Sequence, residues 1–109
     1  MTKLTGVGGV LSCAHEPVNA ELFGGETHGH SYEVIAWFEN DHDADVRTFQ
    51  ASLNTLLELW DHKMLPPDMA TGEAIAKRIG TLNLCVVVEV RRPLERIYAK
   101  WIDPKWRAE

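Results

Sequence analysis

The apolar and polar residues of the first forty positions follow strand patterns. Residues 3–14 mix four aliphatic side chains with three glycines, namely Leu4, Gly6, Val7, Gly8, Gly9, Val10 and Leu11. This mixture predicts a strand that contains bulges or a close approach of another segment, and that ends near His15. Residues 16–27 hold Pro17, Asn19 and two glycines, which predicts a loop. A second strand is predicted over residues 31–39.

The period then changes to that of a helix. The apolar residues Val46, Phe49, Leu53, Leu56, Leu57 and Trp60 recur at helical spacing. We expect Asp43 or Asp45 to cap this helix, which should end near Asp61 and His62. A second helix is predicted to begin at Thr71, with Glu73 in its first turn. Its apolar stripe would be Ile75, Ile79 and Leu82.

Two further strands are predicted near the C-terminus. Residues 84–88 are a continuous apolar run, which is typical of a strand buried on both faces. Residues 94–102 alternate and would place Ile97, Ala99 and Trp101 on one side. The element order is β-β-α-α-β-β, which predicts an α+β fold: a four-stranded antiparallel sheet with both helices on one face. A sheet this small has exposed edges, which favours pairing with other copies of the chain.

Composition narrows the functional classes. The 109 residues are enough for a single domain spanning 1–109, with 45% hydrophobic and 25% charged residues. A net charge of -5 argues against a nucleic-acid partner. We find no apolar run long enough to span a membrane and no signal peptide, and only two cysteines, so we expect a cytoplasmic protein with no membrane partner.

Three histidines lie close together near the N-terminus. His28 and His30 are two residues apart at the start of the second predicted strand, so they would point to the same face. His15 ends the strand before them. Three neutral imidazoles are a common ligand set of catalytic zinc sites, which keep one coordination position open. The alternative is that one or two of them are surface or core histidines, but three within sixteen residues favour the metal.

Three acidic positions add candidate chemistry. Asp61 precedes His62 at a helix end, where a carboxylate can orient an imidazole for proton transfer. Glu89 lies at the end of a buried apolar strand and could accept two parallel N–H bonds from an amino-pyrimidinone ligand, or could simply meet an arginine. Glu26 lies in the glycine loop just before His28, and could equally be an ordinary loop acid.

Together, and in this order, these features resemble the 6-pyruvoyl-tetrahydropterin synthase family, which includes the 6-carboxy-tetrahydropterin synthases of queuosine biosynthesis. Five segments spread over nearly the whole chain carry the resemblance: Leu11-Ser12-Cys13-Ala14-His15, His28-Gly29-His30-Ser31-Tyr32, Trp60-Asp61-His62-Lys63-Met64-Leu65, Ala70-Thr71-Gly72-Glu73-Ala74-Ile75-Ala76 and Val86-Val87-Val88-Glu89.

The resemblance implies a fold, a metal and a substrate. It implies the tunnelling fold, in which subunits join their sheets into a barrel and commonly stack as a dimer of trimers. It implies zinc on His15, His28 and His30, and a dihydroneopterin triphosphate or a related dihydropterin bound at a subunit interface. Glu89 and Thr71 would bind the pterin. Asp61 and His62 would relay protons in a lyase reaction.

The chain departs from this family at the catalytic base. The family usually has a cysteine shortly before its His-Gly-His segment, and depending on the alignment that place holds Gly24 or Glu26. Some relatives, the type III synthases linked to folate synthesis, carry glutamate there and release 6-hydroxymethyl-dihydropterin. Glu26 is thus the first candidate for the base, and Cys13, otherwise a core residue, is the second. A non-catalytic zinc- and pterin-binding homologue is the alternative, and the product stays open.

Overall fold

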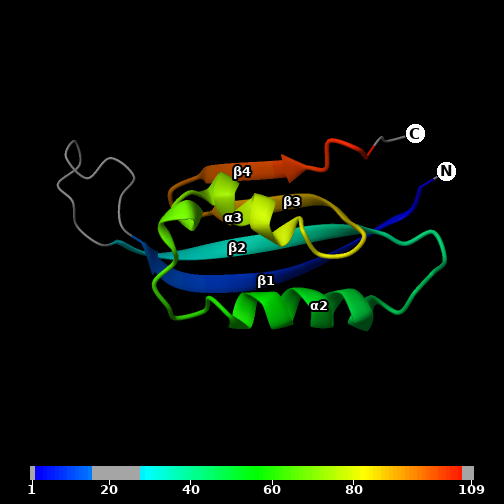
Figure 1. Cartoon of the computed structure of the whole chain (residues 1–109), viewed down its shortest axis with the longest axis horizontal. Helices are drawn as coiled ribbons and strands as arrows, with labels where there is room; N and C mark the ends of the chain where they lie inside the picture. Colours follow the sequence, from blue (N-terminus) through cyan, green and yellow to red (C-terminus); the bar gives the residue numbers. More distant parts are fainter. Residues whose placement is uncertain (1, 16–27, 107–109) are drawn as a thin grey trace.

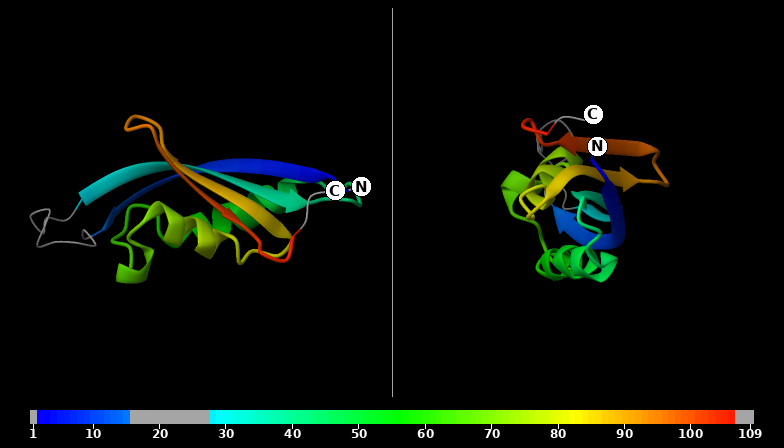
Figure 2. Two further views of the ribbon diagram at one scale, coloured as in Figure 1. Left: turned by 90° about the horizontal axis from the view of Figure 1, so that it is seen from above. Right: turned by 90° about the vertical axis from the view of Figure 1, so that its right-hand side faces the viewer.

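The computed structural model describes residues 2–15 and 28–106, which form one antiparallel sheet with helices on one side. The strands are β1 (Leu4–His15), β2 (His28–Glu39), β3 (Cys85–Arg92) and β4 (Ile97–Ile102), in the spatial order β1-β2-β3-β4. Two α-helices, α2 (Val46–Glu58) and α3 (Gly72–Ile79), and the short 3-10 helix η1 (Pro67–Met69) connect β2 to β3. Figures 1 and 2 show both α-helices against the same face of the sheet. The predicted α+β architecture is confirmed.

The glycines of β1 serve close packing, and β1 contains no bulge. The register of β1 with β2 runs without a break from Leu4 opposite Glu39 to His15 opposite His28. A Cβ atom on Gly6 would lie 2.8 Å from the Trp37 ring, and one on Gly9 would lie 2.8 Å from a methyl group of Leu57. Of the two predicted explanations for these glycines, close approach is therefore correct. The irregularity of the sheet lies between β2 and β3, at Trp37 and Phe38.

Side-chain caps determine where both helices begin. Asp45 caps α2, because its carboxylate accepts a 2.9 Å hydrogen bond from the backbone N–H of Arg47. The Thr71 hydroxyl accepts from the Ala74 N–H at 3.1 Å, so Thr71 is the cap and α3 starts one residue later. Both helices end earlier than predicted. Residues 59–62 form turns, and Leu82 lies beyond the C-cap Gly80, although it still packs against the core.

The hydrophobic core lies between the sheet and the two helices. Its fully buried side chains come from every layer: Leu11, Val34, Phe38, Leu53, Ile75, Ile79, Val88 and Val90. The Phe38 and Phe49 rings stack with their centroids 4.8 Å apart, which joins β2 to α2. Within the single chain, the prediction that the third strand is buried on both faces is wrong. Val86, Val88 and Val90 are buried, whereas Val87 and Glu89, which alternate with them, are half-buried on the opposite face.

One face of the sheet, the covered face, packs against α2 and α3. The other, the open face, carries the alternate residues of the same strands and has no helix against it in the described residues. Among the described residues, no helix is long and apolar enough to cross a membrane. The fourth strand begins at Ile97, later than the predicted Leu94, because residues 93–96 form the turn of the β3–β4 hairpin.

Candidate functional site

The three histidines lie at the far end of the β1–β2 hairpin. The second strand starts at His28, three residues before the predicted start, so His28 and His30 are both part of β2. The backbone register places His15 opposite His28 and Cys13 opposite His30. Residues that face each other across an antiparallel pair, and residues two apart on one strand, share a face. Positions 15, 28 and 30 therefore belong to the covered face, in line with Leu11 and Tyr32.

The side chains of these histidines lie outside the part of the chain that the structure describes, and so does Glu26. Their backbone positions are therefore the structural evidence on the metal site. Among the described side chains, no group of three or more histidine, cysteine, aspartate or glutamate residues could hold a metal ion.

Asp61 and His62 lie against the edge of β1 next to this histidine end. Asp61 Oδ1 accepts a 2.9 Å hydrogen bond from the Ser12 backbone N–H, and the Ser12 carbonyl accepts from the His62 N–H. Ser12 is three residues from His15 and directly precedes the Cys13–His30 pair. At about 3.3 Å per residue, the turn that holds Asp61 lies roughly 10 Å along the strand from His15. The fold thus brings together two motifs that are far apart in sequence.

The geometry of this pair suits proton transfer. Asp61 Oδ2 lies 2.9 Å from Nδ1 of His62, whose side chain is 79% exposed. The hydrogen bond from the Ser12 N–H, together with the bonds and the charge of His62, holds the pKa of Asp61 below its usual value. Asp61 therefore remains a carboxylate that can orient the imidazole and stabilise its charged form. The left-handed backbone of His62, with φ of 58°, turns the chain away after this residue.

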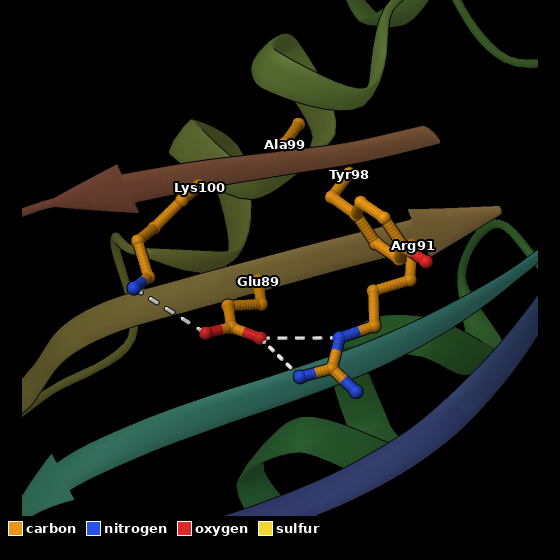
Figure 3. Close-up of a pocket in the computed structure, with 5 residues that line it drawn as sticks. All are labelled: Glu89, Arg91, Tyr98, Ala99 and Lys100. Carbon is orange, nitrogen blue, oxygen red and sulfur yellow. Dashed lines mark hydrogen bonds and ion pairs between the residues drawn. The ribbon is translucent and has the colours of Figure 1, made fainter. Parts of the chain in front are cut away.

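Glu89 lies in the interior of β3, on the open face, and is already paired. Its carboxylate accepts from Arg91 Nε at 3.1 Å and Nη2 at 2.5 Å, and Lys100 Nζ lies 3.4 Å away (Figure 3). Arg91 also reaches Glu33 on β2 at 3.5 Å. The guanidinium hydrogen bonds hold the pKa of Glu89 below its usual value. The alternative that Glu89 meets an arginine is what the single chain shows, and its predicted position at the end of the strand is wrong.

Two cavities flank the third strand, one on each face. The open-face pocket, of about 480 Å³, is lined by Glu89, Arg91, Tyr98, Ala99 and Lys100. The α3 pocket, of about 210 Å³, is lined on the covered face by Tyr32, Ala70, Thr71, Gly72, Glu73, Val90, Arg92, Ile97 and Ala99. Thr71 and Glu89 were predicted to bind one substrate, but they line different cavities within one chain.

Sequence reasoning missed Tyr32 and Arg92 as pocket residues. Both follow from strand alternation once the covered face is known, because Tyr32 is in phase with Val34 and Arg92 with Val90. The sequence does not show that the start of α3 lies over this part of the sheet, which is why the pocket was not predicted. The Gly72 residue permits this position, since a Cβ atom there would lie 3.2 Å from that of Ala99.

Cys13 packs as a core residue. Its side chain is buried among the hydrophobic residues of the covered face. Burial, and secondarily the charge of Asp61, raises the pKa of its thiol to about 11, so in the described surroundings it is protonated at neutral pH. Cys85 is buried as well. The core interpretation of both cysteines therefore agrees with their surroundings.

Comparison with known proteins shows the fold. No protein-family model and no curated protein sequence matches the chain. Among solved structures, the chain is similar to the 6-pyruvoyl tetrahydropterin synthase of Caenorhabditis elegans, with a TM-score of 0.73 and 16% sequence identity. The match covers 94% of this chain and 96% of that protein. The chain thus has the tunnelling fold, and at this identity the likeness shows the fold alone.

Proposed function

We propose that this chain is a zinc-dependent pterin enzyme, a lyase that acts on 7,8-dihydroneopterin triphosphate or a related dihydropterin. The observation that carries the proposal is the backbone register of β1 and β2, which places positions 15, 28 and 30 on one face beside the Asp61–His62 pair. The same fold in a solved tetrahydropterin synthase supports the choice of substrate class.

His15, His28 and His30 would hold the zinc. The paired positions 15 and 28, and position 30 two residues along the same face, fit a three-histidine ligand set. When bound, zinc supplies Lewis acidity toward oxygen atoms of the substrate. No other metal or cofactor is part of the proposal.

Asp61 and His62 would move the proton. Asp61 holds the His62 ring through Nδ1, which leaves the other ring nitrogen to donate or accept a proton at the substrate. Two hydrogen bonds to the Ser12 backbone, one from the His62 N–H and one to the Asp61 carboxylate, would keep this turn near the histidine end of the hairpin. Glu26 is the proposed second base, and with glutamate in that role the 6-hydroxymethyl product of type III synthases is the second candidate reaction.

The substrate would bind between subunits. The sheet has two edge strands, β1 and β4, which carry the exposed apolar side chains Val10, Ile97, Tyr98 and Ile102. Pairing of these edges between copies would build a trimer or a dimer of trimers. In such an assembly the Thr71 of one subunit and the Glu89 of another can contact one pterin, although within one chain they line separate cavities.

Metal content and product analysis test the proposal. The purified protein should contain about one zinc per chain and convert dihydroneopterin triphosphate or dihydroneopterin to a product that mass spectrometry identifies. His28→Ala should lose zinc and turnover. His42→Ala, in the exposed loop before α2, is the matched control and should keep both. Protein without bound zinc and without turnover of either substrate would refute the proposal.

An Asp61→Asn variant tests the proton relay separately from folding. The asparagine side chain keeps an oxygen that can accept from the Ser12 N–H, but it cannot hold a charged imidazole. We expect turnover to fall by roughly 10²-fold or more, with zinc content unchanged. Asp68→Asn, at an exposed acid of η1, should keep full activity. Full activity in Asp61→Asn would show that this pair is not the relay.

A further inference from the structure

A further cavity, the far-end pocket, lies at the end of the sheet opposite the histidines. Its volume is about 350 Å³, and it is lined by Glu39 at the end of β2, residues 80–86 between the end of α3 and the start of β3, and Asp103, Lys105 and Trp106 after β4. Figure 1 shows the loop after α3 and the end of β4 at the same end of the sheet. Because a strand rises about 3.3 Å per residue, Glu39 lies roughly 35 Å from His28 along β2. The far-end pocket is therefore separate from the site proposed for catalysis.

Trp106 brings an unused hydrogen-bond donor to this pocket. Its indole Nε1 is buried and has no hydrogen-bond partner. The segment that carries the ring is anchored to the sheet, because the Trp106 N–H donates to the Asp103 carbonyl at 3.0 Å and the Asp103 N–H donates to the Val86 carbonyl at 2.8 Å. An indole nitrogen can only donate, and a buried donor without an acceptor loses the bond that it made with water. A ligand oxygen beside this ring would restore that bond.

Two charged side chains of the pocket also lack partners. Within the described residues, neither the Glu39 carboxylate nor the Lys105 ammonium group forms an ion pair or a hydrogen bond. Glu39 is half-buried, whereas Lys105 is exposed. Asp103 differs from both, since its Oδ1 accepts a 2.9 Å hydrogen bond from the Lys105 backbone N–H. The pocket thus presents charges of both signs to a ligand.

Together these groups favour a zwitterion over an ion of one sign. An anion would meet the carboxylates of Glu39 and Asp103, and a cation would leave the indole N–H without an acceptor. A ligand with a carboxylate and an ammonium group a few bonds apart pairs with the indole, the lysine and the glutamate at once. The volume of about 350 Å³ is at the lower end of the roughly 300–1,000 Å³ range of small-molecule sites, which suits a molecule of amino-acid size.

The pocket wall also exposes an apolar side chain. Leu84 is 50% exposed and has a left-handed backbone with φ of 67°, which is uncommon for residues other than glycine. Its carbonyl accepts from the Glu39 N–H at 2.9 Å, so this loop residue is tied to the end of β2. Backbone strain of this kind is concentrated at ligand sites and switch regions. An apolar group of a ligand packed against Leu84 would remove part of its surface from water.

We propose that the far-end pocket binds a free α-amino acid with an aliphatic side chain. The Trp106 indole N–H and the Lys105 ammonium group bind its carboxylate, and the Glu39 carboxylate binds its ammonium group. The aliphatic side chain packs against Leu84. Binding here needs neither zinc nor a pterin, because the histidines lie at the opposite end of β2.

Binding measurements with three probes test the class of ligand. L-leucine carries both charges, N-acetyl-L-leucine lacks the ammonium group and L-leucinamide lacks the carboxylate. We expect isothermal titration calorimetry of the purified protein to show L-leucine binding roughly tenfold or more tightly than either analogue, because each analogue loses one charge-assisted hydrogen bond. Equal affinity for the three probes, or no binding of L-leucine at millimolar concentration, would overturn the proposal.

Variants test the assigned residues. Trp106→Phe keeps an aromatic ring without the N–H and should weaken L-leucine binding by roughly tenfold. Glu39→Gln should remove the preference for L-leucine over N-acetyl-L-leucine. The matched control Glu58→Gln, at an exposed residue at the end of α2, should keep this preference.

Thermal unfolding shows whether each variant is folded, and zinc content should be the same in all of them. If Trp106→Phe does not fold, the probe preference of Glu39→Gln decides alone. Folded Trp106→Phe and Glu39→Gln proteins that bind the probes as the native protein does would show that the far-end pocket is not the amino-acid site.

Discussion

The two faces of the sheet are built from the same strands but differ in chemistry: one is apolar and buried, and the other carries charged side chains. On the covered face, Val34, Phe38 and Val88 are fully buried against the helices. On the open face, the alternate positions of the same strands hold the ion pairs of Arg91 with Glu33 and Glu89, and of Lys100 with Glu89. A shift of one residue along a strand therefore separates core packing from charge.

The two faces also give two carboxylates, Glu89 and Glu73, different surroundings. Glu89 on the open face already accepts bonds from a guanidinium and lies beside a lysine, so a ligand must compete with two cations for it. Glu73 lines the α3 pocket with Arg92, whose buried Nε has no partner. The availability of a charged group to a ligand depends on the partners it already has, which neighbouring sequence does not show.

The largest effect on stability should come from removing a buried aromatic ring from the covered face. Phe38→Ala removes a fully buried ring that stacks on Phe49, and we expect a loss of about 3–5 kcal/mol in unfolding free energy. Tyr98→Ala removes an aromatic ring from the open face, where it is 63% exposed, and should cost less than about 0.5 kcal/mol. Urea unfolding of both variants at one protein concentration measures this. Equal losses would mean that the open face is also packed, as it would be inside an assembly.

An intermediate effect is expected where α3 meets β4 on the covered face. Gly80 has helical backbone angles, so an alanine there would be neutral or stabilising if no neighbouring side chain contacted its Cβ atom. A Cβ atom at this position would, however, lie 2.4–2.7 Å from the Trp101 ring. We therefore expect Gly80→Ala to destabilise the protein by about 1–3 kcal/mol. The same substitution in a Trp101→Leu background should lose this penalty, and calorimetry of the four proteins would show whether it does.

The smallest effect should come from the open-face ion pairs, and it should depend on pH. The pKa of Glu89 is held below its ordinary value of 4.5, so its pairing contributes stability above that pH and loses it as the pH falls through the lowered pKa. Arg91→Met should thus lower the urea midpoint slightly at pH 7, and the difference from the native protein should shrink in acid below pH 4.5. A difference that grows in acid would contradict this sign. Added salt should also reduce the difference at pH 7.

Much of the fold could be predicted because it depends on local patterns. The alternation in residues 31–39 and the helical spacing from Val46 to Leu57 each identify one element. Asp45, one of the two predicted caps, caps α2, and Thr71, the predicted first residue of the second helix, is the cap of α3. The helix ends were less predictable. The α2 helix stops at Glu58 because residues 59–62 turn back to hydrogen bond with Ser12, a contact between residues 49 apart in sequence.

The sequence by itself determined the fold class, the order of the elements and the residue types that could bind a metal and move a proton. Periodicity and side-chain chemistry are properties of neighbouring residues, so they can be read without a structure. The tertiary structure alone decided which of these residues meet. The hairpin register aligned His15 with His28, and the turn after α2 brought Asp61 to β1. Strand alternation, combined with the helices on one face, separated Glu89 from Thr71, because contacts between distant segments depend on packing and register.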